Sequence, residues 1–203
     1  MANPDSSKVS AMKPLATGGV LVAPYGTDLP SDKQAPDGNV TIDPAFVALG
    51  YMSQDSNVSN AEENSTKDFA AWGGAIVVTQ TTSRKETYSF KPIEQNVAVW
   101  RLRYGTENVI GDDENAVVVH DGASFNEMHS IIIAEKLRDG RVHLSVIPKA
   151  QLGSTDEVPH SDSDPLGYGM KFTAIAYEGE KTSYDVYYTP DDVHTTTTTT
   201  TTE

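Results

Sequence analysis

The sequence predicts a mainly β domain, a sandwich or barrel of about eight strands with one flanking α-helix. Three observations lead to this prediction. Short stretches of alternating apolar and polar residues recur along the chain, as in half-buried strands. Turn-forming pairs such as Asp139-Gly140 separate several of them. Only the stretch after Pro92 spaces its apolar residues three or four positions apart, as on one face of a helix.

Three segments are expected along the chain. Residues 1–17 are rich in Ser, Pro and Lys and predict a flexible N-terminal arm. Residues 18–189 carry the strand patterns and predict the β domain. Residues 190–203 include an unbroken run of threonines, which has no apolar face and cannot build a core, so this segment is expected to be a disordered tail.

Composition excludes several classes of protein. The chain has 29 acidic and 15 basic residues, which argues against a protein that grips nucleic-acid phosphates. It has no cysteine, so neither disulfides nor thiolate metal sites are possible. No apolar run approaches the roughly 20 residues of a membrane span, and the first residues lack the apolar stretch of a signal peptide. We therefore expect a protein made in a cytoplasm, without a membrane partner.

The first third of the chain alternates between short elements and polar loops. Residues 18–26 form an apolar run between glycines and predict a strand, and the Pro-containing residues 27–39 predict a loop. A helical turn is expected after Pro44, followed by a strand from Tyr51. Residues 54–67 are polar throughout and predict a long loop, a length that is usually functional or disordered.

A Thr-rich hairpin is predicted next. Its arms are residues 75–82 and 86–91, which combine β-branched residues with apolar–polar alternation. Trp72 and two glycines introduce it, at the junction of loop and strand. Trp72 can serve there either as a plug of the core or as a contact residue.

One helix and several further strands complete the expected elements. The spacing of Ile93, Val97, Trp100 and Tyr104 predicts a helix of about three turns that Gly105 ends. Further strands are expected at 116–120, on both sides of the Asp139-Gly140 turn within 128–150, at 170–178 and at 182–189.

The sequence contains no recognisable catalytic motif. The residues nearest to a metal-ligand cluster are His120, Asp121, Glu127, His129 and His143. Counting outward from a two-residue Asp139-Gly140 turn places His143 opposite Lys136 and leaves His129 far along the strand, so the two histidines are not expected to share an ion. We therefore expect no catalytic residue, no metal and no cofactor, although a spatial pair of carboxylates stays open.

Five stretches follow one another between residues 18 and about 188. They are "GGVLVAPYGTDLP", "FVALGYMSQD", "DFAAWGGAIVVTQTT", "YSFKPIEQN" and "DPLGYGMKFTAIAY". In this order and spacing they resemble the major tail tube proteins of long non-contractile-tailed bacteriophages, the siphovirus type.

The resemblance implies a structural role. Subunits of this family form β domains that close into hexameric rings, and the rings stack into a hollow tube through which DNA passes without specific binding. It implies that the partners are further copies of the chain, the tape measure protein, the tail terminator and the distal tail protein. It also implies a location in the virion tail after assembly in the host bacterial cytoplasm.

Two groups of candidate residues follow from this resemblance. The polar loop and the residues before the hairpin are expected to contact a neighbouring subunit or ring, and the polar hairpin face is expected to line the channel. The contact candidates are Asp55, Asn57, Asn60, Glu63, Asp68 and Trp72; the channel-lining candidates are Thr79, Thr81, Thr87 and Ser89.

Two other classes of function remain open at this stage. The first is a β-sandwich surface or adhesin module that binds carbohydrate, and the second is an enzyme on a jelly-roll-like scaffold. Oligomeric state separates a tube subunit from a binding module, because only the tube subunit assembles as its concentration rises.

Overall fold

The computed structural model describes residues 11–14, 19–30, 40–54, 58–121 and 126–189. The predicted N-terminal arm lies largely, and the predicted Thr-rich tail wholly, outside these residues. The described part of the chain is mainly β with a single α-helix, which confirms the predicted fold class. None of its helices has the length and hydrophobicity needed to cross a bilayer.

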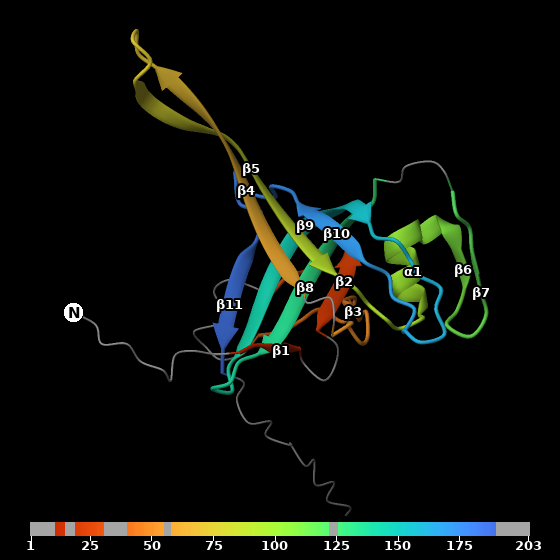
Figure 1. Cartoon of the computed structure of the whole chain (residues 1–203). Helices are drawn as coiled ribbons and strands as arrows, with labels where there is room; N and C mark the ends of the chain where they lie inside the picture. The colour runs from red at the N-terminus through yellow and green to blue at the C-terminus, as the bar shows by residue number, and fades with distance from the viewer. Residues whose placement is uncertain (1–10, 15–18, 31–39, 55–57, 122–125, 190–203) are drawn as a thin grey trace, which may run out of the picture.

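A nine-stranded antiparallel sheet dominates the molecule (Figure 1). Seven strands follow the order β3-β2-β8-β9-β10-β5-β4, while β1 pairs with β8 and β11 with β9. A separate two-stranded sheet joins β6 and β7. The strands are β1 (Lys13–Pro14), β2 (Val20–Pro24), β3 (Val47–Ala48), β4 (Ser59–Ala70), β5 (Ile76–Phe90), β6 (Val109–Gly111), β7 (Ala116–Val118), β8 (Met128–Lys136), β9 (Val142–Thr155), β10 (Met170–Ala174) and β11 (Tyr184–Tyr188).

The β8–β9 hairpin is the centre of the sheet. Consecutive isoleucines in β8 bury both faces, since Ile131 and Ile133 join one apolar cluster while Ile132 joins another. Such a continuous apolar run is what a strand covered on both faces requires. Along its other edge β9 pairs with β11 through its first half and with β10 through its second half.

The two apolar clusters lie on opposite faces of this sheet. One is covered by the helix α1 (Val97–Tyr104) and includes Phe172 and Phe90, whose rings stack 5.4 Å apart. The other packs Leu144, Val146 and Val186 under Phe46. The short β6–β7 hairpin lies beside α1 (Figure 1).

Helix α1 is shorter than predicted. It begins after Asn96, whose side chain accepts a hydrogen bond from the Val99 backbone N–H at 2.9 Å, and it ends at Gly105 as expected. Ile93, the expected first residue, instead donates its N–H to the Tyr51 carbonyl. The side chains that α1 buries are Val99 and Leu102, so the predicted apolar stripe lies beside the buried face.

Several predicted boundaries in the first third were wrong. The predicted strand from Tyr51 is reduced to an isolated bridge between Met52 and Pro92. The short strand β3 lies where a helical turn was expected after Pro44. Later in the chain, the two strands predicted around Gly179 exist as β10, which pairs with β5 and β9, and β11, which pairs with β9.

The register of the β8–β9 hairpin differs from the predicted one by a single residue. The connection is a three-residue loop, because the Leu137 N–H donates to the Arg141 carbonyl and Gly140 adopts a φ of 92°. A three-residue hairpin loop with glycine in the left-handed region is a common alternative to the two-residue turn. As a result His143 lies opposite Glu135, not Lys136.

The long polar segment holds the largest difference. Residues 59–67, expected to be a loop, belong to strand β4, and the two predicted hairpin arms are one continuous strand, β5. The true hairpin therefore consists of β4 and β5, with its turn at Trp72-Gly73-Gly74. Polar composition misled the prediction because both strands project into solvent, where alternation of apolar residues is not required.

Candidate assembly interface

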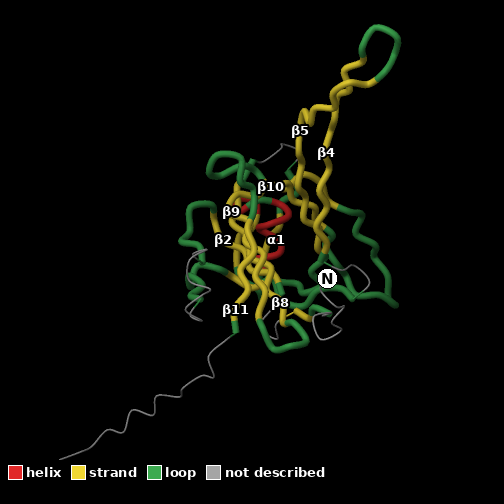
Figure 2. Tube along the Cα trace, turned by 90° about the vertical axis from the view of Figure 1, so that its left-hand side faces the viewer, coloured by secondary structure: helices red, strands yellow, loops and turns green. Residues whose placement is uncertain are grey.

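The β4–β5 hairpin extends far from the body of the molecule (Figures 1 and 2). Every residue of β4 is exposed, and β5 is exposed from Ile76 to Lys85. Burial begins at Glu86, where β5 reaches β10 and joins the main sheet. The hairpin thus has a root within the sheet and an outer part, residues 62–85, that we call the arm.

The tip of the arm presents apolar side chains to solvent. Trp72 is fully exposed, so it is not a plug of the core. Gly73 and Gly74 have φ values of 116° and 87°, which glycine tolerates and other residues rarely adopt. Around this turn Phe69 is 43% exposed and Ile76 is 61% exposed. An exposed cluster of this kind marks an interaction surface more often than an ordinary solvated tip.

Two bulges interrupt the pairing of the arm. Ser65 pairs with Ser83 but Thr66 pairs with Thr81, so Thr82 has no Cα partner in β4. A second register shift lies between Phe69 and Ala70. An extra residue bends the bulged strand and increases its local twist, and the arm is visibly twisted between its root and its tip (Figure 1).

The bulge at Thr82 separates the four channel-lining candidates. Successive residues of a strand point to opposite faces, and one extra residue reverses the order. Thr79 and Thr81 pair with even-numbered residues of β4, as Glu86 and Tyr88 do. All four therefore lie on the same face of the hairpin. Thr87 and Ser89 lie on the other face of the strand.

The contact candidates that can be placed all lie on the hairpin. Asn60 lies at the root, Glu63 at the base of the arm, and Asp68 and Trp72 near the tip. Asp68 accepts a hydrogen bond of 2.6 Å from the Thr79 hydroxyl across the strand pair. Two further candidates, Asp55 and Asn57, lie outside the described residues.

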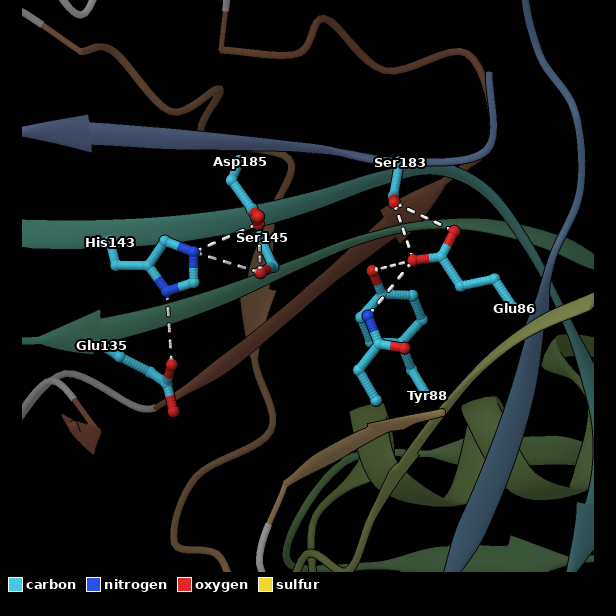
Figure 3. A network of polar contacts seen from close by, with 8 residues as sticks. Glu86, Tyr88, Glu135, His143, Ser145, Ser183 and Asp185 are labelled. Carbon is cyan, nitrogen blue, oxygen red and sulfur yellow. Dashed lines mark hydrogen bonds and ion pairs between the residues drawn. The ribbon is translucent and has the colours of Figure 1, made fainter. Parts of the chain in front are cut away.

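Glu86 organises a polar network at the root (Figure 3). Its carboxylate accepts hydrogen bonds from the Tyr88 hydroxyl at 2.6 Å, from the Ser183 hydroxyl at 2.9 Å and from the Asn60 amide at 3.2 Å. The Thr182 hydroxyl also donates to it. Glu86 is only 3% exposed, so these donors replace the water that a carboxylate would otherwise need. The network joins both hairpin strands to the segment before β11.

The network shifts the acidity of both ionisable partners. Burial by itself raises the pKa of Glu86, but the hydrogen bonds from Thr182, Tyr88, Ser183 and Asn60 prevail and lower it below its usual value. Burial and the neighbouring carboxylate raise the pKa of Tyr88 well above its usual value. Glu86 is therefore charged and Tyr88 neutral near pH 7, which is the combination that the hydrogen bonds need.

A second polar cluster fastens β11 to the sheet (Figure 3). His143 on β9 lies 3.1 Å from the Asp185 carboxylate on β11 and 3.4 Å from the Glu135 carboxylate on β8. Burial by itself favours the neutral ring, but hydrogen bonds and charge attraction to the two carboxylates raise the pKa of His143 to about 9. The Ser145 hydroxyl donates to Asp185 at 2.6 Å. The cluster is thus a charged link across three strands.

One sheet face near the root is polar without being strongly charged. Thr87 pairs with Thr173 of β10, which pairs with Gln151 of β9, while Ser89 pairs with Lys171. Thr87 itself is buried, Ser89, Thr173 and Gln151 are half-buried, and Lys171 is exposed. These five residues, which we call the polar face, include one charge.

Sequence reasoning missed Glu86, Ser183, Thr173 and Gln151. Glu86 falls in a charged stretch that reads as solvated surface, and Ser183 joins it from a segment almost a hundred positions away. Only the alternation of Glu86, Tyr88 and Phe90 signalled that the carboxylate shares a face with the core.

Comparison with known proteins gives one family match. The model of a family described as phage tail tube protein matches residues 1–199. Comparison with curated proteins gives no match.

Proposed function

The chain belongs to the family of phage tail tube proteins, and from this premise we propose that it is the major tail tube subunit of a siphovirus-type tail. Its family is structural, and the protein is not an enzyme. In our proposal, copies of the chain close into hexameric rings, and the rings stack into the channel through which DNA enters the host cell.

The projecting hairpin is the observation that supports this proposal most directly. The outer edge of β4 pairs with none of the described residues over its 12 positions, and an unpaired edge is a template for a strand of another chain. A monomer that acts alone would normally shorten, cover or bend away such an edge. A subunit that is completed by its neighbours needs the edge to stay open.

The arm supplies the contacts between subunits in this proposal. Glu63, Asp68 and Trp72 project from it, and Asn60 holds its root through Glu86. We include Asp55 and Asn57 as contact residues because they precede β4 in the chain.

The polar face near the root is the proposed channel wall. Ser89, Thr173 and Gln151 offer neutral side chains that hold phosphate weakly, Thr87 is buried on the same face, and Lys171 is the one charge there. Thr79 and Thr81 lie on the opposite face of the hairpin, so in this proposal they belong to the arm and not to the channel wall near the root. The formal charge of −14 favours DNA that slides rather than binds.

The other partners in the proposal follow from the role. A tube of defined length needs a tape measure protein that sets this length, and a tail terminator and a distal tail protein that close its two ends. The subunit would assemble in the host cytoplasm and remain in the virion tail.

Concentration-dependent assembly tests the proposal. We expect the purified chain to form rings or tubes in negative-stain micrographs as its concentration rises. A shortened variant, in which residues 66–82 are replaced by Asn-Gly so that Ser65 stays opposite Ser83, should keep the melting temperature of the body because the arm packs on none of its core, but should fail to form tubes. A chain that stays at one small size at every concentration would instead favour a carbohydrate-binding module.

A further inference from the structure

An apolar groove of about 710 Å³ lies beside helix α1. Its walls include Val22 of β2, Val47 and Leu49 in and after β3, Ala98 of α1 and Met128 of β8. Val47 is 54% exposed although it is aliphatic. The groove is therefore an open apolar surface on the body of the molecule.

The floor of the groove holds a polar atom without a hydrogen bond. His129 Nε2 is buried and has no hydrogen-bond partner among the described residues, although the Glu127 carboxylate lies 3.8 Å away. Burial lowers the pKa of His129, so the ring is neutral near pH 7. An apolar wall with an unsatisfied neutral group is unusual for a surface that stays in water.

The arm of the same chain cannot fill this groove. Strand β5 spans 15 residues, or roughly 50 Å at about 3.3 Å per residue, and its outer part points away from the body (Figures 1 and 2). The groove and the arm tip are thus two unlike surfaces of one molecule, both apolar and both exposed. Such a pair can join copies head to tail into rings or filaments, and the proposed tube requires this arrangement rather than a reciprocal twofold exchange.

Size and charge also match the tip to the groove. A tryptophan side chain buries about 150–250 Å² when it is enclosed. Lys67 lies 5.3 Å from the Phe69 ring and brings a positive charge beside the apolar tip, where the adjacent Asp68 carboxylate accepts a hydrogen bond from the Thr79 hydroxyl. The groove is bordered by Glu94, Asp113 and Glu127 with Arg101 as the positive residue among them, so its rim is acidic overall.

We propose that Trp72 and the apolar arm tip of one copy dock in the groove between α1 and β3 of a second copy. The inference rests on the proposed function and names the contact by which neighbouring subunits are joined. One tip buries less than the roughly 800 Å² per partner of a standard interface, so the contact is weak in an isolated pair and becomes strong when an assembly repeats it.

Cysteine pairs test the contact directly, because the chain has no cysteine of its own. An Ala71→Cys chain, which keeps Trp72 and carries the cysteine at the exposed neighbouring position, is mixed with a Val47→Cys chain of different tag length and treated with a short bismaleimide. We expect a heterodimer at about ten-fold higher yield than with the control Val117→Cys, since Val117 is 62% exposed on β7 and does not line the groove. Equal yields from the two pairs overturn the inference.

A charge placed in the groove gives a second readout. Val47→Glu should raise the protein concentration needed for assembly by roughly ten-fold or more, the effect of losing one central contact, whereas Val117→Glu should not. In a Trp100→Phe background Trp72 is the only tryptophan, and its emission should shift to the blue on assembly. The Val47→Glu change should abolish this shift at the unchanged concentration.

The outcomes separate the inference from the proposed function. Tubes that form without the cross-link between positions 71 and 47 retain the tube function and reject this docking site. A cross-link in a chain that never forms tubes supports the docking and rejects the tube function. A blue shift without the cross-link assigns the tip to another surface of the neighbour and also rejects the inference.

Discussion

Single side chains fix the direction in which the arm leaves the sheet. Glu86 receives donors from β4, from β5 and from the segment before β11, so one carboxylate ties three parts of the chain together. A buried carboxylate is stable only while its donors stay in place. The root is therefore a fixed point, whereas the arm beyond it has no such support.

Replacing Glu86 should loosen this root. Glu86→Ala leaves the hydroxyls of Tyr88 and Ser183 without their acceptor, and we expect a loss of about 2–3 kcal/mol in the free energy of unfolding. Because the folded pKa of Glu86 lies below 4.5, its contribution is present above about pH 4.5 and is lost as the pH falls below that value.

Urea denaturation and hydrogen exchange at residues 86–90 and 182–184 measure the effect. Glu63→Ala, an exposed change on the same hairpin, is the matched control and should cost under about 0.5 kcal/mol. Equal stability of the two variants would show that the network contributes nothing.

His143 makes stability depend on pH in the alkaline range. Its folded pKa of about 9 exceeds the usual 6.5, so the stabilisation is complete below about pH 6.5 and is lost as the pH rises through about 9. The full effect is of the order of 3 kcal/mol. The groups facing the ring are Glu135, Asp185 and Tyr187, whose ring stacks 4.4 Å away.

Melting temperatures recorded from pH 6 to pH 9.5 should therefore fall with rising pH. His143→Gln should be less stable at pH 6 and should lose most of this dependence of melting temperature on pH. His120→Gln is the control and should keep the dependence, because the His120 ring stacks against Tyr104 and has no carboxylate partner in the described structure. An identical slope in the His143 variant would exclude the proposed charged link.

At the scale of elements, the bulge at Thr82 decides where the arm points. The extra residue adds twist between root and tip without changing which residues pair on either side of it. A straight hairpin of the same sequence would carry the same tip in another direction.

Deleting Thr82 should therefore separate folding from assembly. We expect an unchanged melting temperature, because the residue lies in the exposed arm. We also expect the protein concentration at which tubes appear to rise by about ten-fold or more. Calorimetry and negative-stain microscopy measure the two effects, and Thr82→Ser, which keeps the bulge, serves as control. Normal tubes from the deletion variant would show that arm direction is unimportant.

At the scale of the whole molecule, net charge opposes association. A charge of −14 makes copies of the chain repel each other, and salt screens this repulsion over about 8–10 Å at physiological strength. Assembly then depends on apolar contacts, such as the arm tip, that salt leaves intact.

Raising the salt concentration from about 20 to 150 mM should accordingly lower the protein concentration at which tubes appear. Light scattering across a salt series measures this threshold. Tubes that dissolve with added salt would show that ion pairs, rather than apolar contacts, hold the subunits together.

The sequence by itself determined the fold class, the central hairpin and the family. Burial imposes the alternation in β10 and the continuous apolar runs in β8 and β9, so the pattern is visible wherever a strand has a covered face. The ordered stretches between residues 18 and 188 carried the family resemblance, which the match over residues 1–199 confirms.

Only the tertiary structure decided what the polar segment does. Strand β4 has no buried face, so no periodicity marked it, and pairing with β5 alone makes it a strand. The bulge at Thr82 and the contacts of Glu86 depend on residues that meet in space across gaps of 17 to 97 positions. Local patterns record burial, whereas register and long-range hydrogen bonds are fixed only when the whole sheet has formed.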